Sequence, residues 1–198
     1  LLHQKGISYD VIILTECAVL PVARNTLVAM FMQDPEATDL FFIDSDVGFG
    51  GDAVLKLLER PEPIVAGIYP LKRDAGGFPV ELKRNADKQT NIENGLIEAD
   101  FLPTGFMRVK RSVFEQMEKA YPELKYKGNV VNVADSGVTE AFDFFNMGAF
   151  DADRWTTEDF SFCKRWRDTG GRLWVYPDIT LTHTGSKIYI ANYGRSLT

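Results

Sequence analysis

The chain has 198 residues, of which 45% are hydrophobic and 25% charged, and 28 acidic against 22 basic residues give a formal net charge of −6. This composition predicts one globular domain with a substantial core, and the absence of a dense Lys/Arg tract argues against general binding to nucleic acid. No apolar run approaches the roughly 20 residues that span a bilayer, and the N-terminus lacks a signal-peptide pattern. The cysteines, Cys17 and Cys163, lie far apart in no metal-like spacing, which favours free thiols in a reducing compartment. We therefore expect a soluble, cytoplasmic protein without a membrane span.

Taken in chain order, apolar runs and turn residues predict alternating strands and helices. Residues 1–5 are typical of a helix end that Gly6 stops. Strands are expected at 9–14, 40–43, 64–69, 78–82, 96–101 and 172–176, and helices at 22–33, 53–60, 111–119 and 157–169. This alternation predicts an α/β fold in which helices flank a mostly parallel central sheet.

The apolar run at 40–43 is typical of a central strand buried on both faces, and it ends abruptly in two carboxylates, Asp44 and Asp46, separated by Ser45. In open α/β sheets ligands bind at the carboxyl ends of strands, where loops present side chains from a rigid support. Paired carboxylates suit Mg²⁺ or Mn²⁺, which keep open positions for phosphate oxygens. A polar turn that only closes a buried strand remains the alternative, because Asp and Ser are ordinary turn residues.

Three further positions are candidates for ligand contact. Arg24 lies in the first turn of its predicted helix, where the helix dipole disfavours a cation, so either a nucleotide or acidic partner lies nearby or the arginine is solvated. Lys72 leaves the end of a strand and faces either a diphosphate or solvent. Gly105 belongs to a tight loop where backbone can approach a ligand.

The C-terminal third supplies three more candidates. Glu158 and Asp159 open the helix expected at 157–169, where the dipole would stabilise both acids even without a function. His183 follows a strand end, as the two aspartates do, although a single histidine is usually just a hydrogen-bonded side chain.

The order of these parts resembles the nucleotide-sugar glycosyltransferases of the GT-A fold, including their small viral and bacterial members. The resemblance rests on four pieces: Asp44-Ser45-Asp46 after an apolar strand, the loop 104–108 with its following helix, Glu158-Asp159 at a helix start, and Pro177 followed by His183-Thr184-Gly185. It implies a single GT-A (Rossmann-like) domain over residues 1–198, in which 1–102 bind the nucleotide sugar and 103–198 bind the acceptor and carry catalysis. Family members start with a strand that contacts the nucleotide base, and this chain begins after that position, so either the sequence is a truncated piece or another strand replaces it.

The resemblance also implies roles for the candidates. Asp46 would be the direct ligand of Mn²⁺ or Mg²⁺, Asp44 the partner of the ribose or of a metal-bound water, and His183 the residue that completes the metal shell. Asp159 would be the base of an inverting transfer, with Glu158 supporting the site; a retaining enzyme with the same metal site is the alternative. The donor would be a nucleotide sugar, a UDP-sugar first of all, and the acceptor a glycan or another hydroxyl. The expected donor contacts are Asp44, Ser45, Asp46, Arg24, Lys72 and Gly105.

Two other classes of protein remain open. An apolar strand followed by Asp-x-Asp also opens the haloacid-dehalogenase phosphatases, in which the first acid is a nucleophile. That motif normally has Thr or Val two residues after the second acid, where this chain has Gly48. The other alternative is a non-catalytic module that binds a sugar nucleotide or glycan without turnover.

Overall fold

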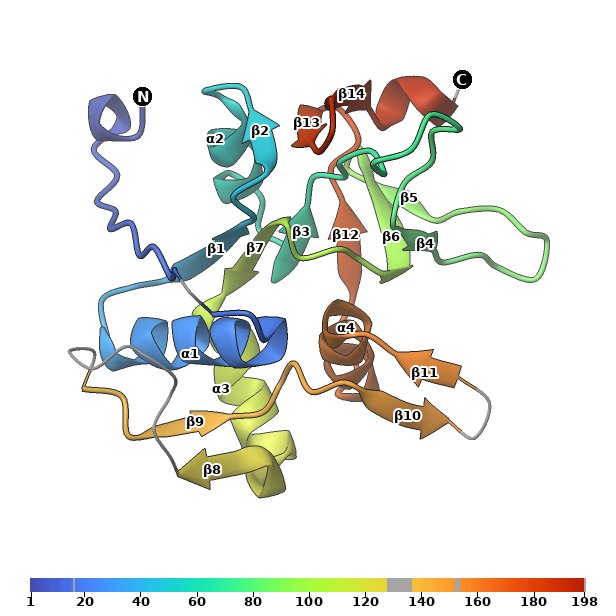
Figure 1. The fold of residues 1–198 in the computed structure, drawn as a ribbon. Coiled ribbons are helices and arrows are strands. Elements are labelled where there is room, and N and C mark those ends of the chain that lie inside the picture. The colour runs from blue at the N-terminus through green and yellow to red at the C-terminus, as the bar shows by residue number, and fades with distance from the viewer. Residues whose placement is uncertain (16, 128–136, 152–153, 198) are drawn as a thin grey trace.

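A mixed seven-stranded sheet lies at the centre of the molecule. The computed structural model describes residues 1–15, 17–127, 137–151 and 154–197 (Figure 1). The strands follow one another in the order β1-β7-β3-β12-β6-β4, and β5 pairs with β6. Their bounds are β1 (Asp39–Ile43), β7 (Phe106–Lys110), β3 (Ile64–Ala66), β12 (Leu173–Val175), β6 (Leu96–Phe101), β4 (Glu81–Leu82) and β5 (Ile92–Glu93). From β1 to β6, strands from residues 1–102 and 103–198 alternate in this sheet.

The pairing of these strands overturns the predicted fold class. Among the described strands of the sheet only β3 and β12 pair in parallel, whereas β1–β7, β3–β7, β6–β12, β4–β6 and β5–β6 are antiparallel. The expectation of a mostly parallel, Rossmann-like GT-A sheet is therefore wrong, and the chain has a small mixed α/β fold. The main reason is β7, which we expected to be a loop leading into a helix. It instead inserts between β1 and β3, antiparallel to both.

The two faces of the sheet are covered differently. Helices α1 (Leu20–Gln33), α3 (Arg111–Ala120) and α4 (Glu158–Asp168) pack on one face, and α2 (Ala53–Leu58) packs on the other. Because side chains alternate along a strand, Met107 and Val109 of β7 face the first layer while Phe106 faces the second. The side chains of β12 alternate in the same way, and Trp174 faces the layer that contains α2. The sheet is thus sandwiched between two hydrophobic clusters.

A three-stranded sheet completes the layer that contains α2. Its order is β14 (Ile188–Asn192), β13 (Thr180–Thr184) and β2 (Val47–Phe49), all antiparallel. Because β2 begins directly after Asp46, this sheet brings the end of β13 beside the Asp44–Asp46 turn. The remaining elements are the pairs β8 (Lys125–Lys127) with β9 (Glu140–Phe142) and β10 (Gly148–Asp151) with β11 (Arg154–Thr156), and the 3-10 helices His3–Lys5, Pro122–Leu124 and Gly194–Leu197.

The helix predictions are confirmed with shifted ends, because local signals mark helix ends. α4 carries Glu158 and Asp159 in its first turn and Arg165 and Arg167 in its last, as the helix dipole favours, and Gly170 follows at φ 88°. No described helix is long and apolar enough to cross a membrane.

Two strand predictions are wrong. Residues 9–14 are not a strand in the structure, and Val11 and Ile13 are 73% and 78% exposed. β1, expected to be central and buried on both faces, is an edge strand in which Phe42 is buried and Ile43 is 41% exposed.

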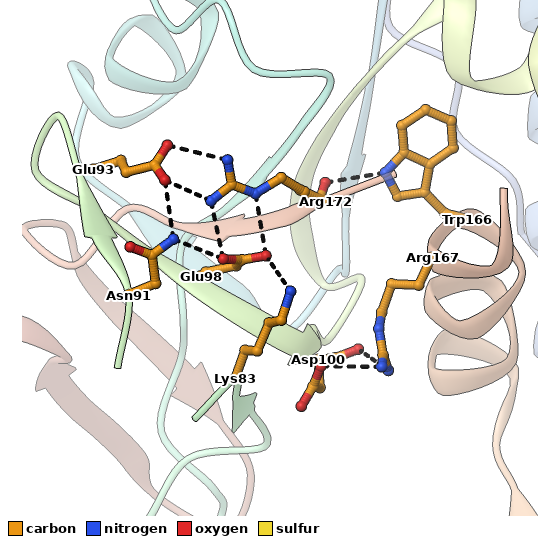
Figure 2. Close-up of polar contacts among 8 residues, drawn as sticks. All are labelled: Lys83, Asn91, Glu93, Glu98, Asp100, Trp166, Arg167 and Arg172. Carbon is orange, nitrogen blue, oxygen red and sulfur yellow. Dashed lines mark hydrogen bonds and ion pairs between the residues drawn. The ribbon is translucent and has the colours of Figure 1, made fainter. Parts of the chain in front are cut away.

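A charged network fixes the opposite edge of the sheet (Figure 2). Glu98 of β6 is 4% exposed and accepts hydrogen bonds from Lys83, Asn91 and Arg172, and Arg172 also pairs with Glu93. Burial of the Glu98 carboxyl raises its pKa, but these hydrogen bonds outweigh burial and lower it from 4.5 to about 2. The network satisfies the buried charge and is structural.

This network predicts a pH dependence of stability. Because the pKa of Glu98 is lower in the folded state, its contribution is complete above about pH 4.5 and is lost as the pH falls toward 2; the pKa difference corresponds to about 3 kcal/mol. Urea unfolding should show Glu98→Gln less stable than the parent by about that amount at pH 7, with the difference shrinking below pH 4.5. Glu93→Gln, at an exposed carboxyl of the same network, serves as the control and should change stability little. A Glu98→Gln difference that is constant with pH would contradict the assignment.

Candidate functional site

Three backbone hydrogen bonds hold the Asp44–Asp46 turn, one within the turn and two to other segments. The Asp44 N–H donates to the Gly105 carbonyl at 3.0 Å, and the Val47 N–H donates to the Asp44 carbonyl at 3.0 Å. The Asp46 carbonyl accepts from the Thr184 N–H at 2.8 Å. Ser45 is exposed at the tip. The turn is therefore anchored to the loop before β7 and to β13, and its two carboxylates are directed by a fixed backbone.

Asp44 faces the buried arginine of α1. The Arg24 Nη2 atom donates to both Asp44 carboxylate oxygens, at 3.2 and 3.4 Å. Arg24 Nε lies 3.8 Å from Glu158 Oε1 and has no hydrogen-bond acceptor within the described chain, although Arg24 is only 6% exposed. Arg24 thus has acidic partners. This agrees with the expectation of a nearby nucleotide or acidic group and not with a solvated arginine. A buried N–H donor without an acceptor is rare, and it marks a place where a ligand oxygen could bind.

Glu158 and Asp159 lie at the N-terminus of α4, close to this pair. Burial, and then the charge of Asp159, raise the pKa of Glu158 above its ordinary range. Asp159 Oδ1 accepts from the Thr157 hydroxyl at 2.6 Å and from the Phe160 N–H at 2.9 Å. The loop and helix therefore hold the Asp159 carboxylate through one oxygen.

Asp46 lies in a separate group with Lys72 and His183. The Lys72 ammonium forms an ion pair with Asp46 Oδ2, and His183 Nε2 lies 3.6 Å from Asp46 Oδ1. His183 Nδ1 lies 2.8 Å from the Pro70 carbonyl. Since a carbonyl only accepts, Nδ1 carries a proton, and Nε2 faces Asp46 with a lone pair in the neutral ring or an N–H in the charged one. Burial raises the pKa of Asp46, but the hydrogen bond and charge of Lys72 and the charge of His183 more than offset this and lower it.

Tyr69 connects the two groups and was not predicted from the sequence. Its ring packs edge-on against His183 with centroids 4.7 Å apart. Burial, and then the charges of Asp44 and Asp159, raise the pKa of its phenol, so both acids act on the same hydroxyl. The only sequence signal was its position at the end of an apolar strand, which does not reveal these contacts.

Gly105 allows this close packing. A Cβ atom at residue 105 would lie 2.7 Å from the Tyr69 hydroxyl and 2.8 Å from Asp44 Oδ2. Any larger side chain would therefore displace the tyrosine and the aspartate. The predicted tight loop thus lies directly against the Asp44 carboxylate. The Gly105 carbonyl also accepts a hydrogen bond from the Asp44 N–H and so positions the Asp44 backbone.

The residues fit a divalent cation only at an open site. Within the described ranges, no three His, Cys, Asp or Glu side chains converge as a metal site. Asp44, expected to contact the ribose or a metal-bound water, is turned to Arg24. Asp46 and His183 remain as two candidate ligands, and a hydrogen bond from Nδ1 to a backbone carbonyl, as His183 makes, is the usual support of a metal-ligating histidine. Two protein ligands suit Mg²⁺ or Mn²⁺ when phosphate oxygens and water supply the rest.

A separate cavity of about 520 Å³ lies beside β2 and β13, and includes Gly48, Thr182, Asp52, Lys56 and Arg195 in its lining. None of the candidate residues lines it. Because the carboxylates, the histidine and the buried arginine lie elsewhere, we place the candidate site at the Asp44–Asp46 turn and not in this cavity.

Comparison with known proteins shows the fold alone. No protein-family model matches the chain, and no curated protein matches it. Among solved structures it is similar to A197 from STIV, with 21% identity, a TM-score of 0.52, and a match that covers 93% of this chain and 76% of that one.

Proposed function

We propose that this protein transfers a sugar from a nucleoside-diphosphate sugar, a UDP-sugar first of all, to a hydroxyl group of a glycan or another acceptor, with Mn²⁺ or Mg²⁺ as cofactor. The observation that carries the proposal is the direction of His183. Its Nδ1–H is engaged by Pro70, so Nε2 faces Asp46 at 3.6 Å with a free lone pair in the neutral ring. This arrangement favours a positive charge between Nε2 and the carboxylate, which a shared cation would supply, as a proton on Nε2 does without one.

The donor side of the site is assigned to Asp46, His183, Lys72, Asp44 and Arg24. Asp46 and His183 would hold the cation, which neutralises charge that builds on the departing diphosphate. The Lys72 ammonium lies beside them and offers a second positive charge to phosphate oxygens. Asp44, held by Arg24, can accept hydrogen bonds from the ribose hydroxyls.

The acceptor side is assigned to Asp159, with Glu158 behind it. The two described hydrogen bonds of the Asp159 side chain are both on Oδ1, which leaves Oδ2 as the oxygen that takes the proton. Asp159 would remove the proton from the acceptor hydroxyl while the acceptor oxygen forms its bond to carbon one and the bond to the diphosphate breaks. Glu158 lies 3.8 Å from Arg24 and supports the site. We favour inversion on this basis.

The geometry is less favourable to a phosphatase. That chemistry needs Asp44 as a free nucleophile, whereas both of its oxygens accept from Arg24. A non-catalytic binding module would use the same donor contacts and differ only in lacking turnover, so a transfer assay separates it from an enzyme.

A thermal-shift panel tests the proposal. Nucleoside diphosphates and nucleotide sugars would each be added with Mn²⁺, with Mg²⁺ or with chelator. A ligand at 100 times its Kd stabilises the folded state by about 2.7 kcal/mol, which raises Tm by roughly 5–10 °C for a chain of this size. We expect one nucleotide sugar to give such a shift, and chelator to remove it. No shift with any nucleotide sugar and either cation would overturn the proposal.

A further inference from the structure

In the structure the Lys72 ammonium lies beside Asp46, where the proposed cation would bind. The Lys72 ammonium contacts Asp46 Oδ2, while His183 Nε2 lies beside Oδ1. One carboxylate oxygen therefore faces a positive charge and the other faces a ring nitrogen. A divalent cation that binds Asp46 and His183 must compete with the Lys72 ammonium for the same carboxylate. The side chains of Lys72 and Asp46 are 37% and 39% exposed, so the pair is open to solvent and to ligands.

The surrounding chain fixes the stem of Lys72 more than its charged end. A Cβ atom at Gly185 would lie 3.1 Å from Lys72 Cδ and 3.5 Å from Cγ, so the stem lies against the turn between β13 and β14. Lys187 of the same turn forms an ion pair with Asp74, which ties this turn to the loop that carries Lys72. Beyond Cδ the lysine is a flexible stem with a compact charge, and the ammonium can move while the stem stays in place.

We infer that Lys72 is an exchangeable counter-ion of the donor site: its ammonium neutralises Asp46 in the free protein, leaves Asp46 when a divalent cation binds there, and then pairs with the diphosphate of the donor. The inference rests on the proposed function. An exposed ion pair holds its partners together by a factor of only a few, so this exchange is readily reversible.

The exchange makes the cation and the nucleotide bind cooperatively. A cation alone must displace Lys72 without offering it a new partner, so it binds weakly. A nucleoside diphosphate supplies phosphate oxygens for the displaced ammonium and therefore strengthens cation binding. By thermodynamic linkage, the cation strengthens nucleotide binding by the same factor.

Binding of Mn²⁺ to Lys72→Met tests this inference. Free Mn²⁺ would be measured by electron paramagnetic resonance with the parent and the variant, first alone and then with UDP. Without UDP, the variant should bind Mn²⁺ about three- to fivefold more tightly than the parent, because the competing charge is gone. UDP should raise the Mn²⁺ affinity of both proteins, because its phosphate oxygens also coordinate the cation. The gain should be about three- to fivefold larger in the parent, where UDP also binds the displaced ammonium.

Two further variants serve as controls. Lys187→Met removes a neighbouring charge that pairs with Asp74 and not with Asp46, and it should change both affinities less than about twofold. Lys72→Arg keeps the charge and should retain the weak binding of Mn²⁺ alone.

The outcomes separate this inference from the proposed function. If the parent binds Mn²⁺ in the presence of UDP but Lys72→Met binds Mn²⁺ alone no more tightly than the parent, the role of Lys72 is wrong and the proposed function stands. If no variant binds Mn²⁺ with or without UDP, both are overturned. A gain in Mn²⁺ affinity equal in Lys72→Met and Lys187→Met would show a general charge effect and also overturn the inference.

Discussion

Replacing Asp159 by asparagine should lower the rate of sugar transfer by about 10³-fold, within the range that a general base contributes. An asparagine oxygen can still accept the hydrogen bonds that the Thr157 hydroxyl and the Phe160 N–H donate, so the helix terminus should keep its geometry. The amide cannot take a proton from the acceptor. Release of nucleoside diphosphate at saturating donor would give the rate, and the thermal shift with donor and Mn²⁺ should match that of the parent.

Glu158→Gln is the matched control for this prediction. It makes the same chemical change one residue earlier, at a side chain that lies against Arg24. We expect it to reduce the rate less than about tenfold, because Glu158 does not receive the proton. A larger loss in Glu158→Gln than in Asp159→Asn would exchange the two roles. Equal rates in the parent and Asp159→Asn would remove general-base catalysis from the proposal.

The sequence predicted the bounds of single elements better than the sheet that the strands form. α1, α4 and β6 lie close to their predicted ranges, because caps, glycine stops and apolar periodicity are local signals. The resemblance also implied that His183 completes a metal shell with Asp46, and the two side chains lie 3.6 Å apart, although His183 is inside β13 and does not follow a strand end. Strand direction is not a local property, however, and nothing in the pattern of residues 40–43 distinguishes an antiparallel edge strand from a central parallel one.

β7 shows why the fold class was missed. Its five residues include Arg108 between Met107 and Val109, and a charged residue interrupts the pattern of a buried strand. In the structure Arg108 is fully buried because its guanidinium donates to the backbone carbonyls of Leu57 and Arg60. Those acceptors are about 50 residues away in sequence, so only the folded chain reveals that the arginine is satisfied.

The segment 9–14 fails as a strand for a related reason. Val11, Ile12 and Ile13 have high strand propensity, but a strand also needs a partner for its backbone N–H and C=O groups. No strand pairing involves this segment in the part of the chain that the structure describes. Strand propensity alone therefore predicted a strand where the described chain has an unpaired segment. The same limit applies to Tyr69, whose loop packs against His183 of β13 and against Gly105 in the loop before β7.

Replacing Asp46 by asparagine should remove cation-dependent binding of the donor. Because its pKa is lowered, mainly by Lys72 against the opposing effect of burial, Asp46 is ionised at neutral pH and can act as a cation ligand. Loss of a direct ligand should weaken binding by at least about 100-fold, which exceeds the usual effect of a supporting residue. At a donor concentration of 100 times the parental Kd, the remaining stabilisation is about 0.4 kcal/mol, so the Tm shift falls to roughly 1 °C.

Asp52→Asn provides the control because it removes the same charge a few residues later. Asp52 is an exposed acid that pairs with Lys56 at 3.0 Å, and it does not contact His183 or Lys72. It should keep the full Mn²⁺-dependent shift. Both ion pairs are exposed and contribute little to stability, so neither variant should unfold. If Asp46→Asn binds donor as tightly as the parent, the cation assignment is refuted. Because the variant should remain folded, a loss of binding can be attributed to the missing ligand.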